Sequence, residues 1–225
     1  MVLRYSLLFA AGTLLCVQPV YAAEPATWLT QWFASQTNVQ TWSAEVIQTR
    51  TLKTLTQPLT ATGHVWFAAP NHFRWEIGQP NPTIAVRQPD QLLVMYPRLK
   101  RAERYSLSAD QPGPWRDTLA LLEAGFPRSQ SDLESRFRIV SQSVSNEVYE
   151  IKIQPRSAVA RRLMPELRVA FGTNDFMLRA TELEFTDGSR MRNDFTNGVR
   201  NPRIDESIFV PKLDADFKIV EPLKR

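Results

Sequence analysis

Hydrophobic and polar positions alternate every two residues along most of the chain from residue 42 onward. In residues 72–77, Phe73, Trp75 and Ile77 alternate with Arg74 and Glu76, which places the apolar side chains on one face of an extended strand. Pro, Gly and Asn separate successive runs of this kind. The pattern predicts a sheet with one dry and one wet face, with strands at residues 42–53, 60–68, 72–77, 82–87, 91–96, 99–107, 137–144, 148–154, 165–171, 177–186 and 189–195, and a short final strand at 217–220.

Helical spacing replaces this alternation at three places. Near the start of the predicted mature chain, apolar side chains recur at i, i+3 and i+4, and these are Leu29, Trp32 and Phe33. A second run follows a proline at position 114, which can begin a helix, and its apolar side chains are Trp115, Leu119, Leu122 and Phe126. Ser131 and Glu134 have the spacing of a capping box and predict a third short helix.

So many strands with so few helices predict a mainly β fold. The helices cannot cover the strands as an α/β layer, so we expect a strongly curved antiparallel β-sheet or barrel of about eleven strands with two or three helices. A barrel of this width is too wide for its own side chains to fill. Helices, a ligand or both must therefore occupy the interior.

The N-terminal residues predict a cleaved export signal. Arg4 precedes an apolar run over residues 7–17, and Val20 and Ala22 occupy the −3 and −1 positions of a cleavage site. We therefore expect residues 1–22 to be removed and residues 23–225 to form one domain in the periplasm. An uncleaved anchor is the alternative, although the run is shorter than the ~20 apolar residues of a membrane span.

Cys16 is the only cysteine of the chain and lies within the predicted signal. The residue before it is Leu15, whereas a lipoprotein signal has a small residue there, so we do not expect the protein to be lipidated. A mature chain without cysteine has no disulfides, no thiol catalysis and no cysteine-ligated metal. The net charge of +4 is a mild excess that favours anionic lipid surfaces or an acidic partner.

The sequence contains no convincing catalytic site. His64 and His72 have no partners at metal-ligand spacing, and we find no Gly-x-Ser-x-Gly elbow, Ser-x-x-Lys or Gly-rich phosphate loop. Glu182 and Glu184 share a strand face, but flanking arginines indicate a charge-balanced outer surface. We predict that the protein is not an enzyme and binds neither a metal nor a cofactor.

Basic residues gather in two clusters, which are Arg98, Lys100, Arg101 and Arg104, and Arg156, Arg161 and Arg162. A groove for single-stranded nucleic acid would combine such charges with aromatic side chains, but an exported protein rarely meets that ligand. We therefore expect these charges to protect strand edges or to dock a membrane or partner, and we expect no nucleic-acid partner and a monomeric protein.

The segment Pro70-Asn71-His72-Phe73-Arg74-Trp75-Glu76 resembles the Pro-x-x-Phe-x-Trp strand of LolA-type outer-membrane lipoprotein carriers. A Gly-x-x-x-Phe strand (residues 63–67) precedes it, and a Gln-Pro turn, a strand ending in Tyr-Pro (residues 90–97) and the helical insertion near Trp115 follow in the order of that family. The C-terminal residues 204–211 are similar to the closing Asp-x-x-x-Phe-x-x-Pro segment of the family. The resemblance covers essentially the whole predicted mature chain.

The resemblance implies an incomplete barrel with a helical lid that carries the acyl chains of lipoproteins. Such carriers receive lipoproteins from an inner-membrane ABC transporter complex (LolCDE-like) and pass them to an outer-membrane acceptor (LolB-like), without a cofactor or covalent chemistry. In many characterised carriers an arginine directly before the motif proline helps to latch the lid, whereas this chain has Ala69 there. Arg74 and Arg50 are candidates for a different latch.

These arguments single out two groups of residues. We expect the acyl cavity to be lined by Val65, Phe67, Phe73, Trp75, Leu92, Val94, Tyr96, Leu119 and Leu122, and the lid to be formed by Leu29, Trp32 and Phe33. For each residue, an ordinary place in the core without ligand contact is the alternative. For the whole chain, the alternatives are a sensor or scaffold module of the same fold in the cell envelope, a carrier of a lipid other than a lipoprotein, and a lipid-modifying enzyme.

Overall fold

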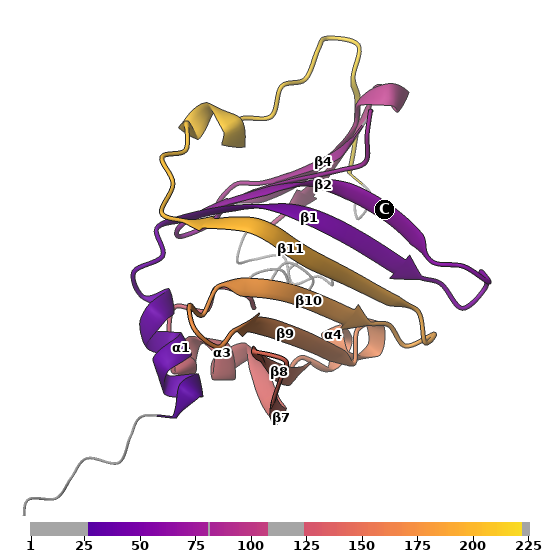
Figure 1. The fold of residues 1–225 in the computed structure, drawn as a ribbon. Helices are drawn as coiled ribbons and strands as arrows, with labels where there is room; N and C mark the ends of the chain where they lie inside the picture. Colours follow the sequence, from indigo (N-terminus) through magenta and orange to yellow (C-terminus); the bar gives the residue numbers. More distant parts are fainter. Residues whose placement is uncertain (1–26, 81, 108–123, 222–225) are drawn as a thin grey trace, which may run out of the picture.

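The computed structural model describes residues 27–80, 82–107 and 124–221. Within these residues, twelve strands form one strongly curved sheet (Figure 1) in the order β12-β6-β5-β4-β3-β2-β1-β11-β10-β9-β8-β7. The strands are β1 (Thr41–Thr51), β2 (Leu59–Ala68), β3 (His72–Ile77), β4 (Thr83–Arg87), β5 (Gln91–Tyr96), β6 (Arg101–Ser106), β7 (Phe137–Ser145), β8 (Val148–Pro155), β9 (Glu166–Gly172), β10 (Leu178–Glu184), β11 (Arg190–Arg200) and β12 (Lys218–Val220). The predicted mainly β fold with a curved, open sheet is confirmed.

The sheet consists of two arms that meet at its long central strands. We call β2–β6 the first arm and β7–β10 the second arm; β1 and β11 lie between them and pair with each other. Val46 of β1 lies opposite Gly63 of β2 on one side and Phe195 of β11 on the other. A glycine is required at position 63, because a Cβ there would lie 1.8 Å from the Glu76 carbonyl oxygen of β3.

The last strand departs from the predicted antiparallel arrangement. β12 pairs in parallel with β6, with Lys218 opposite Arg101. Tight hairpin turns produce antiparallel neighbours, whereas a long connection allows a parallel pair, and a long segment separates β11 from β12. Lys100 fixes this segment through ion pairs to Asp214 at 3.1 Å and Asp216 at 3.3 Å.

The described residues contain three α-helices and two 3₁₀ turns. They are α1 (Trp28–Gln36), α3 (Gln130–Arg136), α4 (Ala158–Leu163), η1 (Pro97–Leu99) and η2 (Glu206–Phe209). The predicted helix over residues 114–126 lies mostly outside the described residues. The short helix α4 was not predicted, because a single apolar-basic turn of this length carries too weak a periodicity.

The start of α3 differs from the predicted capping box. Ser129, not Ser131, is the N-cap residue, and its hydroxyl oxygen accepts a hydrogen bond from the Asp132 backbone nitrogen at 3.0 Å. Asp132 in turn accepts a hydrogen bond from the Arg128 backbone nitrogen. The helix therefore begins one residue before the predicted serine, because serine and aspartate satisfy the free backbone N–H groups at the helix start.

The main hydrophobic core packs the two helices against the second arm and extends across β1 and β11 to β2 and β3. Trp28 of α1 stacks on Tyr149 of β8 with ring centroids 4.4 Å apart, and Trp32 stacks on Phe171 of β9 at 4.5 Å. Leu133 of α3 is fully buried in the same cluster. The second arm is thus packed by its two helices.

A second, smaller core lies on the opposite face of the first arm. Its buried members are Val86, Leu93, Met95 and Ala102, and they are packed by Leu213 and Phe217 of the C-terminal segment. The predicted single wet face is therefore wrong for this part of the sheet, because the C-terminal segment covers it. Alternation along one strand cannot reveal that a distant segment returns over its outer face.

Candidate functional site

The inner face of the first arm contains an apolar cavity of about 510 Å³. The side chains that line it come from seven strands or strand ends: Gln48, Arg50, Leu59, Thr60, Ala61, Phe73, Trp75, Ile77, Thr83, Ala85, Arg87, Leu92, Val94, Tyr96, Glu103, Tyr105, Met191 and Asn193. This volume lies within the range of roughly 300–1,000 Å³ that is typical of sites for small ligands.

The floor of the cavity follows from the strand register. Trp75 of β3 lies opposite Ala85 of β4, which lies opposite Val94 of β5. Since residues directly opposite each other project from the same face of a sheet, these three side chains form one row. Alanine in the middle of the row leaves space between two larger side chains.

One wall of the cavity carries a chain of hydrogen bonds across three strands. The Arg50 Nε–H donates to Gln48 Oε1 at 2.8 Å, and Gln48 Nε2 donates to Asn193 Oδ1 at 3.0 Å. Asn193 Nδ2 then donates to Thr181 Oγ1 at 3.1 Å. Gln48, Asn193 and Thr181 are buried, so these bonds compensate for the loss of water around the two amides.

The opposite wall carries a carboxylate that is already satisfied. Glu103 accepts a hydrogen bond from the Tyr105 hydroxyl at 2.6 Å and pairs with Arg101 at 2.6 Å. Burial and the hydrogen bond to Glu103 raise the pKa of Tyr105. Burial and then the Glu103 charge also raise the pKa of Tyr96, against the opposing effect of Arg101 and Arg50.

Five of the residues predicted for the acyl cavity line this cavity, and they are Phe73, Trp75, Leu92, Val94 and Tyr96. Val65 is fully buried in the main core, and Phe67 lines a different pocket. Leu119 and Leu122 lie outside the described residues. Whether any of these side chains contacts a ligand stays a prediction.

The three residues predicted for the lid lie in the main core. Leu29, Trp32 and Phe33 are 7%, 1% and 6% exposed, and none of them lines the larger cavity. Arg74, one candidate for the latch, lies on the opposite face of β3, where it donates to Glu76 and to the Ile208 carbonyl of η2. Arg50, the other candidate, lies at the cavity. The lid role itself stays a prediction.

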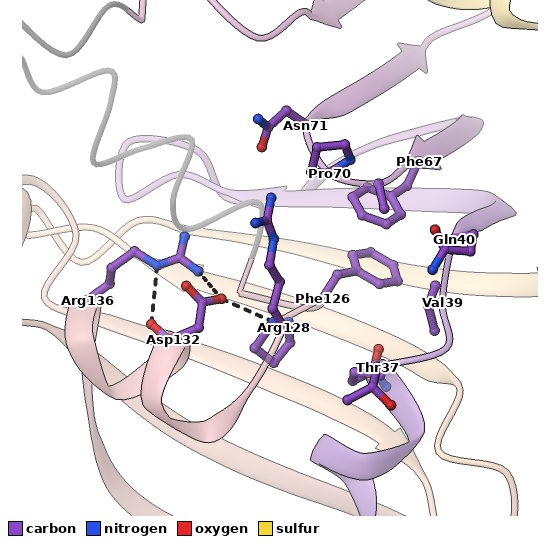
Figure 2. A pocket seen from close by; sticks show the side chains of 13 residues that line it. Thr37, Val39, Gln40, Phe67, Pro70, Asn71, Phe126, Arg128, Asp132 and Arg136 are labelled. Atoms are coloured by element: carbon purple, nitrogen blue, oxygen red, sulfur yellow. Dashed lines mark hydrogen bonds and ion pairs between the residues drawn. The ribbon is translucent and has the colours of Figure 1, made fainter.

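A second pocket of about 440 Å³ lies where the end of α1, the turn between β2 and β3, and the start of α3 meet (Figure 2). Phe67 and Phe126 stack there with ring centroids 4.7 Å apart. Figure 2 shows Asp132 between Arg136 and the backbone nitrogen of Arg128, and it accepts hydrogen bonds from both. Asp132 and Arg136 of this pocket therefore help to fix the start of α3.

Sequence reasoning missed the polar residues of the cavity. Gln48, Asn193 and Glu103 were not proposed, although a signal for two of them was present. Asn193 is in phase with Met191 and Phe195, and Gln48 is in phase with Val46, so the same alternation that identified the apolar face also placed these amides on it.

The described residues offer neither a cluster of side chains for a metal ion nor a membrane-spanning helix. They contain no group of three or more His, Cys, Asp or Glu side chains placed to hold a metal ion. Across residues 27–80, 82–107 and 124–221, no helix has the length and apolar character needed to cross a membrane.

Comparisons with solved structures find several similar folds at low identity. An uncharacterized conserved protein from Thermus thermophilus matches with a TM-score of 0.49 and 11% identity, covering 85% of this chain and 98% of that chain. A putative outer membrane lipoprotein-sorting protein domain from Vibrio parahaemolyticus matches with a TM-score of 0.46 and 11% identity, covering 81% and 94%. The MucA/MucB complex from Pseudomonas aeruginosa matches with a TM-score of 0.43 and 16% identity, covering 86% and 62%.

The sequence comparisons give a clearer result for the family than for individual relatives. Among curated protein sequences, none matches this chain. The family model described as "Outer membrane lipoprotein carrier protein LolA" matches residues 37–212, which include β1 to β11 and the cavity-lining residues. The chain therefore belongs to the LolA family.

Proposed function

We propose that this protein is a periplasmic carrier that binds the acyl chains of lipoproteins and moves them from the inner to the outer membrane. The observation that carries the proposal is the apolar cavity of about 510 Å³ on the inner face of the first arm. Family membership supports the lipoprotein as cargo, and the N-terminal signal-like sequence supports the periplasm. A LolCDE-like transporter would deliver the cargo and a LolB-like protein would accept it.

The physical need for such a cavity follows from the cost of exposing hydrocarbon to water. Moving one acyl chain of ~16 carbons through water costs on the order of 12 kcal/mol, at ~0.8 kcal/mol per CH₂ group. A carrier must return most of this free energy on binding, but not so much that it cannot release the chain. Binding and release need no covalent step, and the cavity residues are accordingly assigned no catalytic role.

The decisive experiment identifies the cargo directly. The protein should be purified from its own cell envelope and extracted, and acylated molecules should be identified by mass spectrometry. Spheroplasts should then be tested for release of lipoproteins to the added protein. We expect an acylated molecule at near-stoichiometric amount, and a protein that carries no lipid and releases none would contradict the proposal.

Matched substitutions test whether the cavity is the binding site. Trp75 lines the cavity, whereas Trp66 on β2 lies outside it and stacks on His64. We expect Trp75→Glu to weaken the binding of a fluorescent acyl probe at least about tenfold, or ~1.4 kcal/mol, since a carboxylate would have to be buried against hydrocarbon. Trp66→Glu should bind normally.

A second cavity variant keeps the test decisive if Trp75→Glu fails to fold. Val94 is only partly buried and faces the same cavity, so Val94→Glu should fold and should also lose affinity. Val140→Glu, at a half-exposed position of β7, is its matched control. Normal acyl binding by both cavity variants, with their fold verified by circular dichroism, would contradict the assignment of the site.

A further inference from the structure

The hydrogen-bonded chain from Thr181 to Arg50 places two buried amides at the wall of the apolar cavity. Gln48 and Asn193 are 6% and 1% exposed, and burying two amides stabilises a fold less than burying two apolar side chains of similar size. Their neighbours on the inner face include Val46 and Phe195, which are both apolar and buried. The packing of the sheet therefore does not explain why amides occupy these two positions.

The two hydrogen-bonded amides do explain the position of one arginine. Gln48 Oε1, at the outer end of this hydrogen-bonded chain, accepts a hydrogen bond from Arg50 Nε at 2.8 Å. Because Nε already donates to Gln48, the two terminal nitrogens of the guanidinium can donate hydrogen bonds to another acceptor. Among the described residues, no carboxylate lies within ion-pair distance of Arg50.

The surroundings of Arg50 combine a cation with exposed apolar surface. In the sheet, Arg50 lies opposite Leu59 of β2 and Met191 of β11, and all three side chains line the cavity. Leu59 is 52% exposed. At the edge of the cavity, an exposed apolar side chain therefore lies next to an exposed cation. This pair is chemically complementary to an amphiphile at the point where its hydrocarbon chain joins its head group.

The opposite wall does not compensate the charge of Arg50. Its carboxylate, Glu103, is engaged by Arg101 and by the Tyr105 hydroxyl. The rim of the cavity therefore offers a cation on the side of β1 and a neutralised carboxylate on the side of β6. This arrangement favours an anionic group on the ligand.

We propose that Arg50 binds the anionic head group of a lipid whose single acyl chain occupies the cavity. The head group is a carboxylate or a phosphate, since both accept hydrogen bonds from the two terminal nitrogens of a guanidinium. A cavity of about 510 Å³ lies in the lower half of the range for small-ligand sites, roughly 300–1,000 Å³, and suits one chain. Gln48 and Asn193 are positioning residues that orient Arg50. This inference rests on the acyl binding of the proposed function and goes beyond it, since it adds a single-chain anionic lipid as a further ligand of the cavity.

The experiment compares lipids that share a chain and differ in the head group. Myristate, myristoyl lysophosphatidic acid and the uncharged monomyristoylglycerol should each be used to displace an uncharged fluorescent acyl probe from the full chain. We expect one or both anionic lipids to bind about tenfold more tightly than the neutral lipid, because a charge-assisted hydrogen bond at a rim is at the weaker end of its range. Which anionic lipid binds more tightly identifies the head group.

Substitutions then assign this preference to Arg50. Arg50→Gln should abolish the preference for anionic lipids and leave the affinity for the neutral lipid within about twofold. Gln48→Leu, which keeps the charge but removes the acceptor for Nε, should reduce the preference to an intermediate value. Arg138→Gln removes the same charge from the exposed end of β7, where Arg138 contacts Gln154, and should behave like the unmodified protein.

The outcomes separate this inference from the proposed function. Equal affinities for anionic and neutral lipids, or an unchanged preference in Arg50→Gln, would overturn the role of Arg50 and leave acyl carriage intact. Failure of all three lipids and of the probe to bind would overturn acyl carriage, and the head-group site with it.

Discussion

The position of α1 permits a test of whether this helix is a movable lid or a fixed part of the core. Trp32 is 1% exposed, stacks on Phe171 with an interplanar angle of 7°, and contacts Phe33 at 4.9 Å between ring centroids. The perturbation is Trp32→Ala, which removes the indole and leaves the backbone of the helix unchanged. Because Trp32 is so completely packed, we expect, in contrast to the lid predicted from the sequence, that α1 behaves as a fixed part of the core.

The magnitude follows from the packing. A buried Trp→Ala substitution costs about 3–5 kcal/mol of unfolding free energy, of which the stacked aromatic pair contributes roughly 0.5–1.5 kcal/mol beyond the buried area. If α1 instead opened as a lid, the rest of the protein could stay folded with α1 undocked. The substitution could then lower the unfolding free energy by no more than the free energy of that opening. In that case the substitution would also favour the open state and strengthen acyl binding.

The assay is urea unfolding followed by far-ultraviolet circular dichroism, with acyl-probe affinity measured on the same preparation. With a slope of ~2–3 kcal/mol per M urea, the expected loss lowers the midpoint by about 1–2.5 M, and the affinity of the folded protein stays within about twofold. Ala34→Ser, at an exposed position of the same helix, should change stability by less than ~0.5 kcal/mol. A loss below ~1 kcal/mol together with tighter acyl binding would refute the fixed-core reasoning and support the lid.

Two further predictions concern a helix cap and a phenol. Ser129→Ala removes the side-chain acceptor at the start of α3 and should lower the unfolding free energy by ~1 kcal/mol, measured by urea titration; Ser145→Ala at the exposed end of β7 is a control that should have little effect. Because burial and the bond to Glu103 raise the pKa of Tyr105, its contribution to stability is complete below the ordinary tyrosine pKa of about 10 and is lost as pH rises above it. Stability measured from pH 8 to 11 should therefore fall less steeply in Tyr105→Phe, and identical slopes would contradict this role of Tyr105.

Much of the strand layout could be predicted from the sequence because alternation reports directly on a two-faced sheet. The segments 72–77 and 91–96 were predicted with the boundaries that β3 and β5 have in the structure. The parallel pairing of β12 with β6 could not be predicted, since alternation indicates which face a residue occupies but not which strand lies beside it. The cover over Leu93 and Met95 was missed for the same reason: it depends on contacts with the distant Phe217.

The candidate site could be predicted only in its apolar part. Phe73, Trp75 and Val94 were singled out as aromatic or aliphatic side chains on predicted inner faces, and all three line the cavity. The boundary between a filled core and an open cavity could not be predicted. Val65 and Trp75 are direct cross-strand neighbours and both belong to the main core, yet only Trp75 also lines the cavity.

The division of the inner face into two halves gives the strongest physical argument for a ligand. Along the second arm, aromatic side chains of α1 pack against Tyr149 and Phe171, so the apolar face of these strands is covered by apolar side chains of the helix. Along the first arm, within the described residues, Trp75 and Val94 border a cavity instead. Each 100 Å² of apolar surface removed from water contributes about 2.5 kcal/mol, and the small side chains of Ala61 and Ala85, which line the cavity, limit how much apolar surface this part of the sheet can bury. An acyl chain entering the cavity would add the burial that these two small side chains do not provide.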